Sequence, residues 1–154
     1  MRALIWIVDE TWRSTVGAAA RYVPSTAEIT LLHVAPTEAE TVAKGGWQGL
    51  LGRHYPQPDR LLQFISIESA QTLLADAKTL LGRDASKLAR RGKIAQEVLT
   101  AAEGFDLLVC ARDTARGNRG PHSLGPATRR IVDHSACAVL LIWPEPSSGT
   151  GKSS

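Results

Sequence analysis

The run Asp106-Leu107-Leu108-Val109-Cys110-Ala111 leads, through a loop rich in glycine and arginine, to a helical pattern that begins at Pro126. Its apolar residues are continuous and do not alternate with polar ones, which is typical of a parallel strand buried on both faces. Pro126 suits the first turn of a helix, where its missing N–H has no partner to lose. A buried strand followed by a loop and a helix is the repeating unit of a parallel α/β sheet.

The same unit recurs along the chain. Continuous apolar runs predict buried strands at residues 3–8, 27–33, 105–110 and 138–143. A weaker run at residues 86–90 predicts a fifth strand at an edge of the sheet. Helical patterns lie between the strands, at residues 14–23, 68–81, 93–103 and 126–135, and Ser14 is expected to cap the first. Right-handed crossovers convert this alternation into a doubly wound, five-stranded parallel sheet of order 3-2-1-4-5, with helices on both faces.

The length of 154 residues suits one domain with a hydrophobic core, which we place at residues 1–144. Residues 37–63 are expected to form a long, glycine-rich connection. Connections of this length are uncommon, and they serve as lids or contact arms or remain surface loops. Residues 145–154 are rich in Pro, Gly and Ser, and we expect this tail to be disordered.

Composition and charge exclude several classes of protein. The 44% of hydrophobic and 21% of charged residues are ordinary for a globular protein. No run approaches 18 apolar residues and the apolar start is too short for a signal peptide, so a cytoplasmic protein without membrane contact is expected. The net charge of +3 is dispersed, with no basic stripe interleaved with aromatic residues, which argues against a nucleic-acid partner. Cys110 and Cys137 are predicted at opposite edges of the sheet, as free thiols.

The sequence predicts neither a catalytic residue nor a metal site. The four histidines show no pairing at helical spacing, which a metal site on one helix would need. A G-x-S-x-G nucleophile elbow is absent from the sequence, so an α/β-hydrolase is not indicated. His33 ends a predicted strand, and we expect a rim histidine whose ring nitrogens both have partners.

Ligands bind doubly wound sheets outside the carboxyl ends of the strands, where the strand order reverses. The rim of that crevice would consist of residues 9–13, 34–36 and 111–125. The last of these segments supplies glycines and ends at a helix N-terminus, whose free N–H groups suit phosphate oxygens. Positive charge in this stretch comes from five arginines: Arg112, Arg116, Arg119, Arg129 and Arg130.

Four segments resemble the universal stress protein family, in the family's order: Ile7-Val8-Asp9, Thr30-Leu31-Leu32-His33-Val34-Ala35-Pro36, Phe105-Asp106-Leu107-Leu108-Val109 and Ile131-Val132-Asp133-His134-Ser135-Ala136-Cys137-Ala138-Val139-Leu140-Leu141. The resemblance extends from Ala3 to Pro144. It implies an adenine nucleotide alpha hydrolase-like fold, a regulatory role in stress, and at most slow ATP hydrolysis. The same resemblance implies that, in a bound adenine nucleotide, the ribose is contacted by Asp9 and the adenine edge by the main chain of Val34.

The phosphate loop departs from the pattern of ATP-binding members, Gly-x2-Gly-x9-Gly-Ser/Thr. This chain reads Ala111-x2-Thr114-x10-Gly125-Pro126, so two glycines and the hydroxyl residue are replaced and the loop is one residue longer. Each charge-assisted bond lost through Pro126 weakens phosphate binding by about 1.5–3 kcal/mol, although the next two residues keep their N–H groups. The residues predicted to bind nucleotide are Asp9, Val34, Ala111, Arg112, Thr114, Gly125, Ala127 and Thr128.

The residues predicted to bind nucleotide are compatible with two functions. The first is a regulatory protein that binds ATP, ADP or AMP, with Mg²⁺ if the ligand is ATP. The second is a stress protein of the same fold that binds no nucleotide and acts through protein contacts, which the altered glycine positions motivate. The apolar strand at residues 138–142 is expected at an open edge of the sheet, which invites a partner. The resemblance implies a homodimer through this strand.

Overall fold

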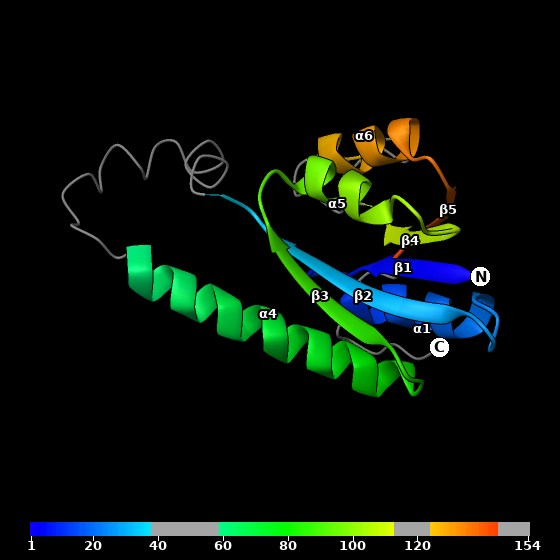
Figure 1. Ribbon diagram of the computed structural model, residues 1–154, viewed down its shortest axis with the longest axis horizontal. Helices are drawn as coiled ribbons and strands as arrows, with labels where there is room; N and C mark the ends of the chain where they lie inside the picture. The colour runs from blue at the N-terminus through cyan, green and yellow to red at the C-terminus, as the bar shows by residue number, and fades with distance from the viewer. Residues whose placement is uncertain (38–58, 113–123, 145–154) are drawn as a thin grey trace, which may run out of the picture.

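The computed structural model describes residues 1–37, 59–112 and 124–144 of the chain (Figure 1). The strands are β1 (Arg2–Trp6), β2 (Glu28–Ala35), β3 (Ser86–Arg91), β4 (Leu107–Ala111) and β5 (Ala138–Ile142). The helices are α1 (Trp12–Tyr22), α4 (Asp59–Leu81), α5 (Ile94–Ala102) and α6 (Pro126–His134). Strand and helix alternate in the described part of the chain, as the sequence predicts.

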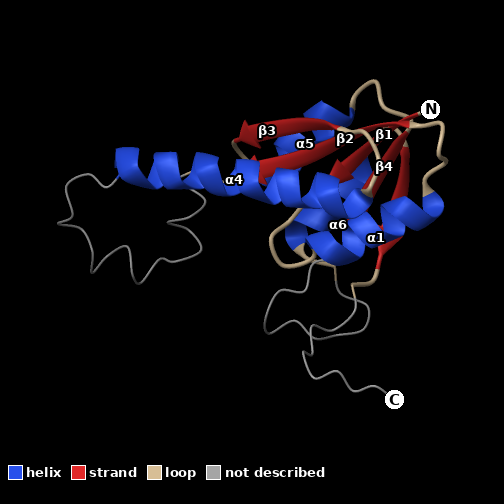
Figure 2. Ribbon diagram, turned by 90° about the horizontal axis from the view of Figure 1, so that it is seen from below, coloured by secondary structure: helices blue, strands red, loops and turns tan. Residues whose placement is uncertain are grey.

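The five strands form one parallel sheet of order β3-β2-β1-β4-β5. The predicted fold class and strand order are therefore confirmed. The order reverses at β1, which pairs with β2 on one side and with β4 on the other. Figure 2 shows the sheet with its helices, and α4 continuing past the end of the strands.

Two hydrophobic cores lie on the two faces of the sheet. Successive side chains of β1 point to opposite faces, so Ala3 and Ile5 join one core while Leu4 and Trp6 join the other. Helices α1 and α4 cover the first core, and α5 and α6 cover the second (Figure 1). Because both faces are covered, the central strands are mostly apolar, and β4 is apolar from end to end. This is the pattern that identified them in the sequence.

Two predicted boundaries were wrong. Helix α4 begins at Asp59 and not at Glu68, so the last five residues of the predicted connection 37–63 are helical. The signal was present in the sequence, since Leu61, Leu62 and Ile65 have helical spacing and Pro58 directly precedes the helix. Helix α1 begins at Trp12 after Thr11, so Ser14 lies inside its first turn and is not the N-cap.

Other boundaries differ from the predicted ones by one or two residues, which is the usual uncertainty of element ends. The remaining residues of the predicted connection and the predicted disordered tail lie outside the described residues. Within the part of the chain that is described, no helix combines the length and the apolar character that a membrane span requires.

The sheet has two different edges. Strand β3 lies at one edge, as predicted, and β5 lies at the other. Cys110 in β4 is buried, Cys137 just before β5 is half-buried, and both thiols are free. Because β5 lies at an edge of the sheet, its position is compatible with pairing to a second copy of the chain. The homodimer stays a prediction.

Candidate functional site

A cavity of about 310 Å³ opens at the carboxyl ends of β1 and β2. Its walls come from the end of β1 and the turn after it, from the end of β2, from α4 and from the first residue of α5. The lining residues are Trp6, Ile7, Val8, Asp9, Glu10, His33, Val34, Ala35, Pro36, Ser69, Ala70 and Ile94. The cavity therefore brings together two of the three predicted rim segments, residues 9–13 and 34–36.

Asp9, Glu10 and His33 are the titratable residues of this cavity, and Asp9 and His33 are in contact with each other. The Nε2 atom of His33 lies 3.6 Å from Oδ1 of Asp9, and the side chains are 15% and 77% exposed respectively. Burial lowers the pKa of His33 below its ordinary value of 6.5, and the Asp9 carboxylate opposes that shift in part. The imidazole is therefore neutral at neutral pH, while the Asp9 side chain remains open to a ligand.

The second ring nitrogen of His33 corrects the expectation of a fully satisfied histidine. Nδ1 is buried and has no hydrogen-bond partner within the part of the chain that the structure describes. A buried nitrogen without a partner costs free energy, of the order of 1–3 kcal/mol. Sequence reasoning could not detect this, because His33 sits in an ordinary strand-end pattern and its surroundings depend on α4.

Val34 contributes to the cavity differently from Asp9. Its side chain is 5% exposed and belongs to the core under α5 and α6. The side chain thus has a packing role in this structure. A contact of the Val34 main chain with a base, which the resemblance implies, stays a prediction.

The residues predicted after β4 do not line this cavity. Ala111 is the buried last residue of β4. The backbone N–H of Arg112 donates to the carbonyl of Ile142 at 2.8 Å, and its guanidinium lies 5.6 Å from the ring centroid of Trp143. Arg112 is thereby directed toward the β5 side of the site. Thr114, Arg116 and Arg119 lie outside the described residues.

The N-terminus of α6 is the third part of the predicted site. Gly125 is the N-cap residue and makes no side-chain capping bond, and Pro126 occupies the first turn as predicted. The free N–H groups of this turn belong to the residues that follow, which suits an anion in principle. Thr128 is 1% exposed, however, so its side chain lies in the interior and its hydroxyl does not reach the surface. Ala127 is half-buried against the core under α5 and α6.

A second hollow, of about 520 Å³, adjoins the first and shares Asp9 and Ser69 with it. Helix α4 supplies the rest of its lining, which is Glu68, Thr72, Leu73 and Asp76. The described lining of the two hollows therefore contains carboxylates and no lysine or arginine. Sequence reasoning missed this acidic wall, since α4 was not among the predicted rim segments. No group of three metal-ligating side chains occurs among the described residues.

No family model matches the sequence, and none of the curated proteins matches it. Solved structures do match the fold. The hypothetical protein MJ0577 is 18% identical with a TM-score of 0.70, over 95% of this chain and 98% of that one. A universal stress protein from Archaeoglobus fulgidus is 16% identical with a TM-score of 0.63, over 92% of this chain and 98% of that one. A universal stress protein in complex with cAMP is 14% identical with a TM-score of 0.59, over 94% of this chain and 98% of that one.

Proposed function

We propose that this chain, which has the fold of the universal stress proteins, is a regulatory protein that binds an adenine nucleotide at the carboxyl ends of β1 and β2. The observation that carries the proposal is one cavity of about 310 Å³ that brings Asp9 and Val34 together from two neighbouring strands. Its volume is at the lower end of the range for ligand pockets. It lies outside the carboxyl ends of the strands, which is the side on which doubly wound sheets bind ligands, and it adjoins β1, at which the strand order reverses.

Each described residue has a part in this proposal. The exposed Asp9 carboxylate accepts hydrogen bonds from the two ribose hydroxyls. The main chain after Val34 borders the base. The phosphates extend past β1 toward Arg112 and the N-terminus of α6, which carries free N–H groups and a partial positive charge.

The cAMP complex of a protein with this fold supports an adenine nucleotide as the ligand class. We propose ATP, ADP or AMP for this chain, with Mg²⁺ accompanying ATP. The Mg²⁺ would be held mainly by the phosphates, which is common for this ion. The role is regulatory, with ATP hydrolysis slow or absent.

A second candidate is a stress protein that binds no nucleotide and acts through protein contacts. Pro126 at the start of α6 and the buried Thr128 side chain favour it, because both reduce what this helix offers to a phosphate. The acidic lining around Asp9 favours it as well, since carboxylates repel phosphate.

The deciding experiment starts with protein purified without added ligand. The protein is denatured and the supernatant is assayed for nucleotide by mass spectrometry, and ligand-free protein is then titrated with ATP and Mg²⁺, ADP, AMP and cAMP by calorimetry. The first candidate predicts binding that weakens about ten- to a hundredfold in Asp9→Ala, the effect of losing bonds to a charged acceptor.

The matched control is Asp84→Ala, which removes an exposed carboxylate from the loop before β3, at the opposite end of the strands. This variant should bind nucleotide as the wild type does. If the wild-type protein releases no nucleotide on denaturation and binds none in the titration, the first candidate is excluded and the second remains.

A further inference from the structure

The outer side of β5 is a strand edge with no pairing partner among residues 1–37, 59–112 and 124–144. Strand β5 pairs with β4, and no described residue pairs with its other side. The carbonyl of Ile142 accepts from Arg112 and so points toward β4. Because successive residues of a strand direct their polar groups to alternate sides, Val139 and Leu141 direct theirs to the open side. Two sets of backbone donors and acceptors are therefore available to another strand.

The opposite edge of the sheet is protected against such pairing. Strand β3 carries the exposed side chains of Lys87 and Arg91, and charged residues on an edge strand discourage a further strand from adding. Strand β5 has no charged residue, and four of its five apolar side chains are partly exposed. Trp143, directly after it, is 58% exposed. Only one of the two edges is thus suited to receive a strand.

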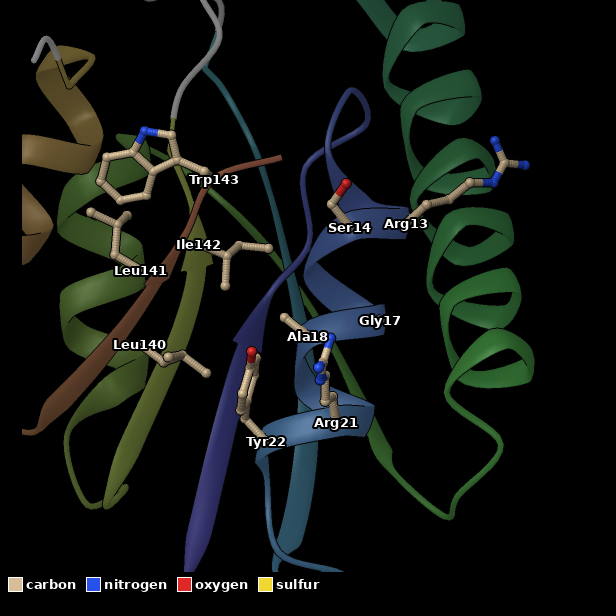
Figure 3. Close-up of a pocket in the computed structure, with 10 residues that line it drawn as sticks. All are labelled: Arg13, Ser14, Gly17, Ala18, Arg21, Tyr22, Leu140, Leu141, Ile142 and Trp143. Carbon is tan, nitrogen blue, oxygen red and sulfur yellow. The ribbon is translucent and has the colours of Figure 1, made fainter. Parts of the chain in front are cut away.

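A groove of about 640 Å³ runs beside this open edge, between α1 and β5 (Figure 3). Leu140 and Ile142 form its wall on the β5 side, and Gly17 and Ala18 form the facing wall on α1. The α1 wall is set back because its residues are small. A Cβ atom built on Gly17 would meet no atom within 4 Å. The groove can therefore accept apolar side chains from an added strand.

The charges along the groove are positive. Arg21 follows α1 toward Ala18 in Figure 3, and its guanidinium is 5.5 Å from the ring centroid of Tyr22. Arg13 lines the other end of the groove, but its side chain extends away from β5 in Figure 3, and its guanidinium lies 4.7 Å from the ring centroid of Trp12. Neither guanidinium has a carboxylate within ion-pair distance among the described residues. The described residues that line the groove include no aspartate or glutamate.

We propose that the groove between α1 and β5 binds an extended, acidic segment of a partner protein, which adds to the open edge of the sheet as a sixth strand. Backbone hydrogen bonds to Val139 and Leu141 supply affinity, as in other cases of strand addition. Alternate apolar side chains of the segment enter the groove over Gly17. Its carboxylates pair with Arg21, which selects acidic partners.

A second copy of the chain is the other occupant to consider, since a homodimer through the same strand is predicted from the sequence. A second copy brings apolar side chains and an unpaired edge, but the described lining of its own groove contains the same two arginines and no carboxylate. An acidic segment complements Arg21 and a second copy does not. The acidic segment should therefore displace a second copy from the edge.

The test uses two labelled synthetic peptides, one of alternating Val and Glu and one of alternating Val and Lys, titrated with the full chain by fluorescence anisotropy. The Val/Glu peptide should bind, and its affinity should fall as salt is raised. Arg21→Glu should weaken it at least about tenfold and Arg13→Glu by a smaller factor. Gly17→Leu should abolish binding by filling the groove.

Two controls separate strand addition from general charge attraction. Arg91→Glu, on the protected edge strand β3, makes the same charge change far from the groove and should leave binding unchanged. A Val/Glu peptide N-methylated at alternate residues keeps its charges but lacks half of its N–H donors, and it should lose binding.

Three results would overturn the proposal. One is equal binding of the Val/Glu and Val/Lys peptides. Another is a Val/Glu affinity that Arg21→Glu and Gly17→Leu leave unchanged while circular dichroism shows both variants folded. The third is a dimeric mass by light scattering that excess Val/Glu peptide does not reduce. A second copy would then occupy the open edge of β5 in place of the peptide.

Discussion

His33 and Asp9 meet where two neighbouring parallel strands end, with Nε2 of His33 3.6 Å from Oδ1 of Asp9. The contact follows from the register of the sheet, in which Trp6 of β1 is paired with Leu32 of β2. The next residues along the two strands then reach the same rim, and Asp9 stands just beyond it. A mostly buried imidazole and an exposed carboxylate are thus brought into one cavity by strand pairing and by the turn that follows β1.

This pair makes stability depend on pH. The pKa of His33 is lower in the folded protein than its ordinary value of 6.5, so the unfolded chain binds more protons just below pH 6.5. Stability should therefore be full above pH 6.5 and should fall as the pH drops below it. Urea midpoints measured at pH 7.5 and 5.5 should differ more for the wild type than for His33→Gln. Equal differences for both proteins would contradict the buried neutral histidine.

Asp9→Asn provides an independent check on the same pair. The Asp9 carboxylate raises the pKa of His33 against the larger effect of burial. Its removal should lower that pKa further, which a histidine titration by NMR measures directly. A rise of the pKa in the variant would show that Asp9 does not act on His33 through its charge.

Cys110 should be unreactive in the folded protein. Burial raises the pKa of its thiol to about 12, and the thiolate is the form that reacts with alkylating agents. In a Cys137→Ser variant, iodoacetamide at pH 8 should label Cys110 only after urea is added, as mass spectrometry would show. Rapid labelling without urea would mean that β4 opens readily.

The substitution Ile5→Ala in the core should lower the free energy of unfolding. This side chain is fully buried in the centre of β1, and Ile→Ala changes at such sites cost about 2–5 kcal/mol. Leu80→Ala is the matched control, because Leu80 on α4 is 51% exposed and surface changes stay within about 0.5 kcal/mol. Urea unfolding of the two variants gives both values.

Two glycines should respond to alanine in opposite directions. Gly17 is exposed inside α1 with open space around it, so Gly17→Ala should stabilise the protein by about 1 kcal/mol and raise Tm by about 2–4 °C. Gly82 follows α4 with φ of +71°, which an L side chain rarely adopts, so Gly82→Ala should lower Tm. Calorimetric scans compare the two.

The fold class and the strand order could be predicted from the apolar pattern of the chain. Buried parallel strands read as continuous apolar runs, and the fixed handedness of their crossovers leaves the order 3-2-1-4-5 with β3 and β5 at the edges. The same reasoning placed Asp9 and Val34 on one rim, because the carboxyl ends of parallel strands meet at one side of a sheet. The start of α4 was missed although its spacing was visible, since the prolines before it read as part of a loop.

The packing of the folded chain sets the surroundings of those residues. It turned Thr128 into the interior, placed the acidic wall of α4 beside Asp9, left Nδ1 of His33 without a described partner and opened the groove between α1 and β5. Each of these joins elements that are far apart in the chain. Such contacts depend on strand register and on how each helix is rotated against the sheet, and neither quantity is set by local sequence spacing.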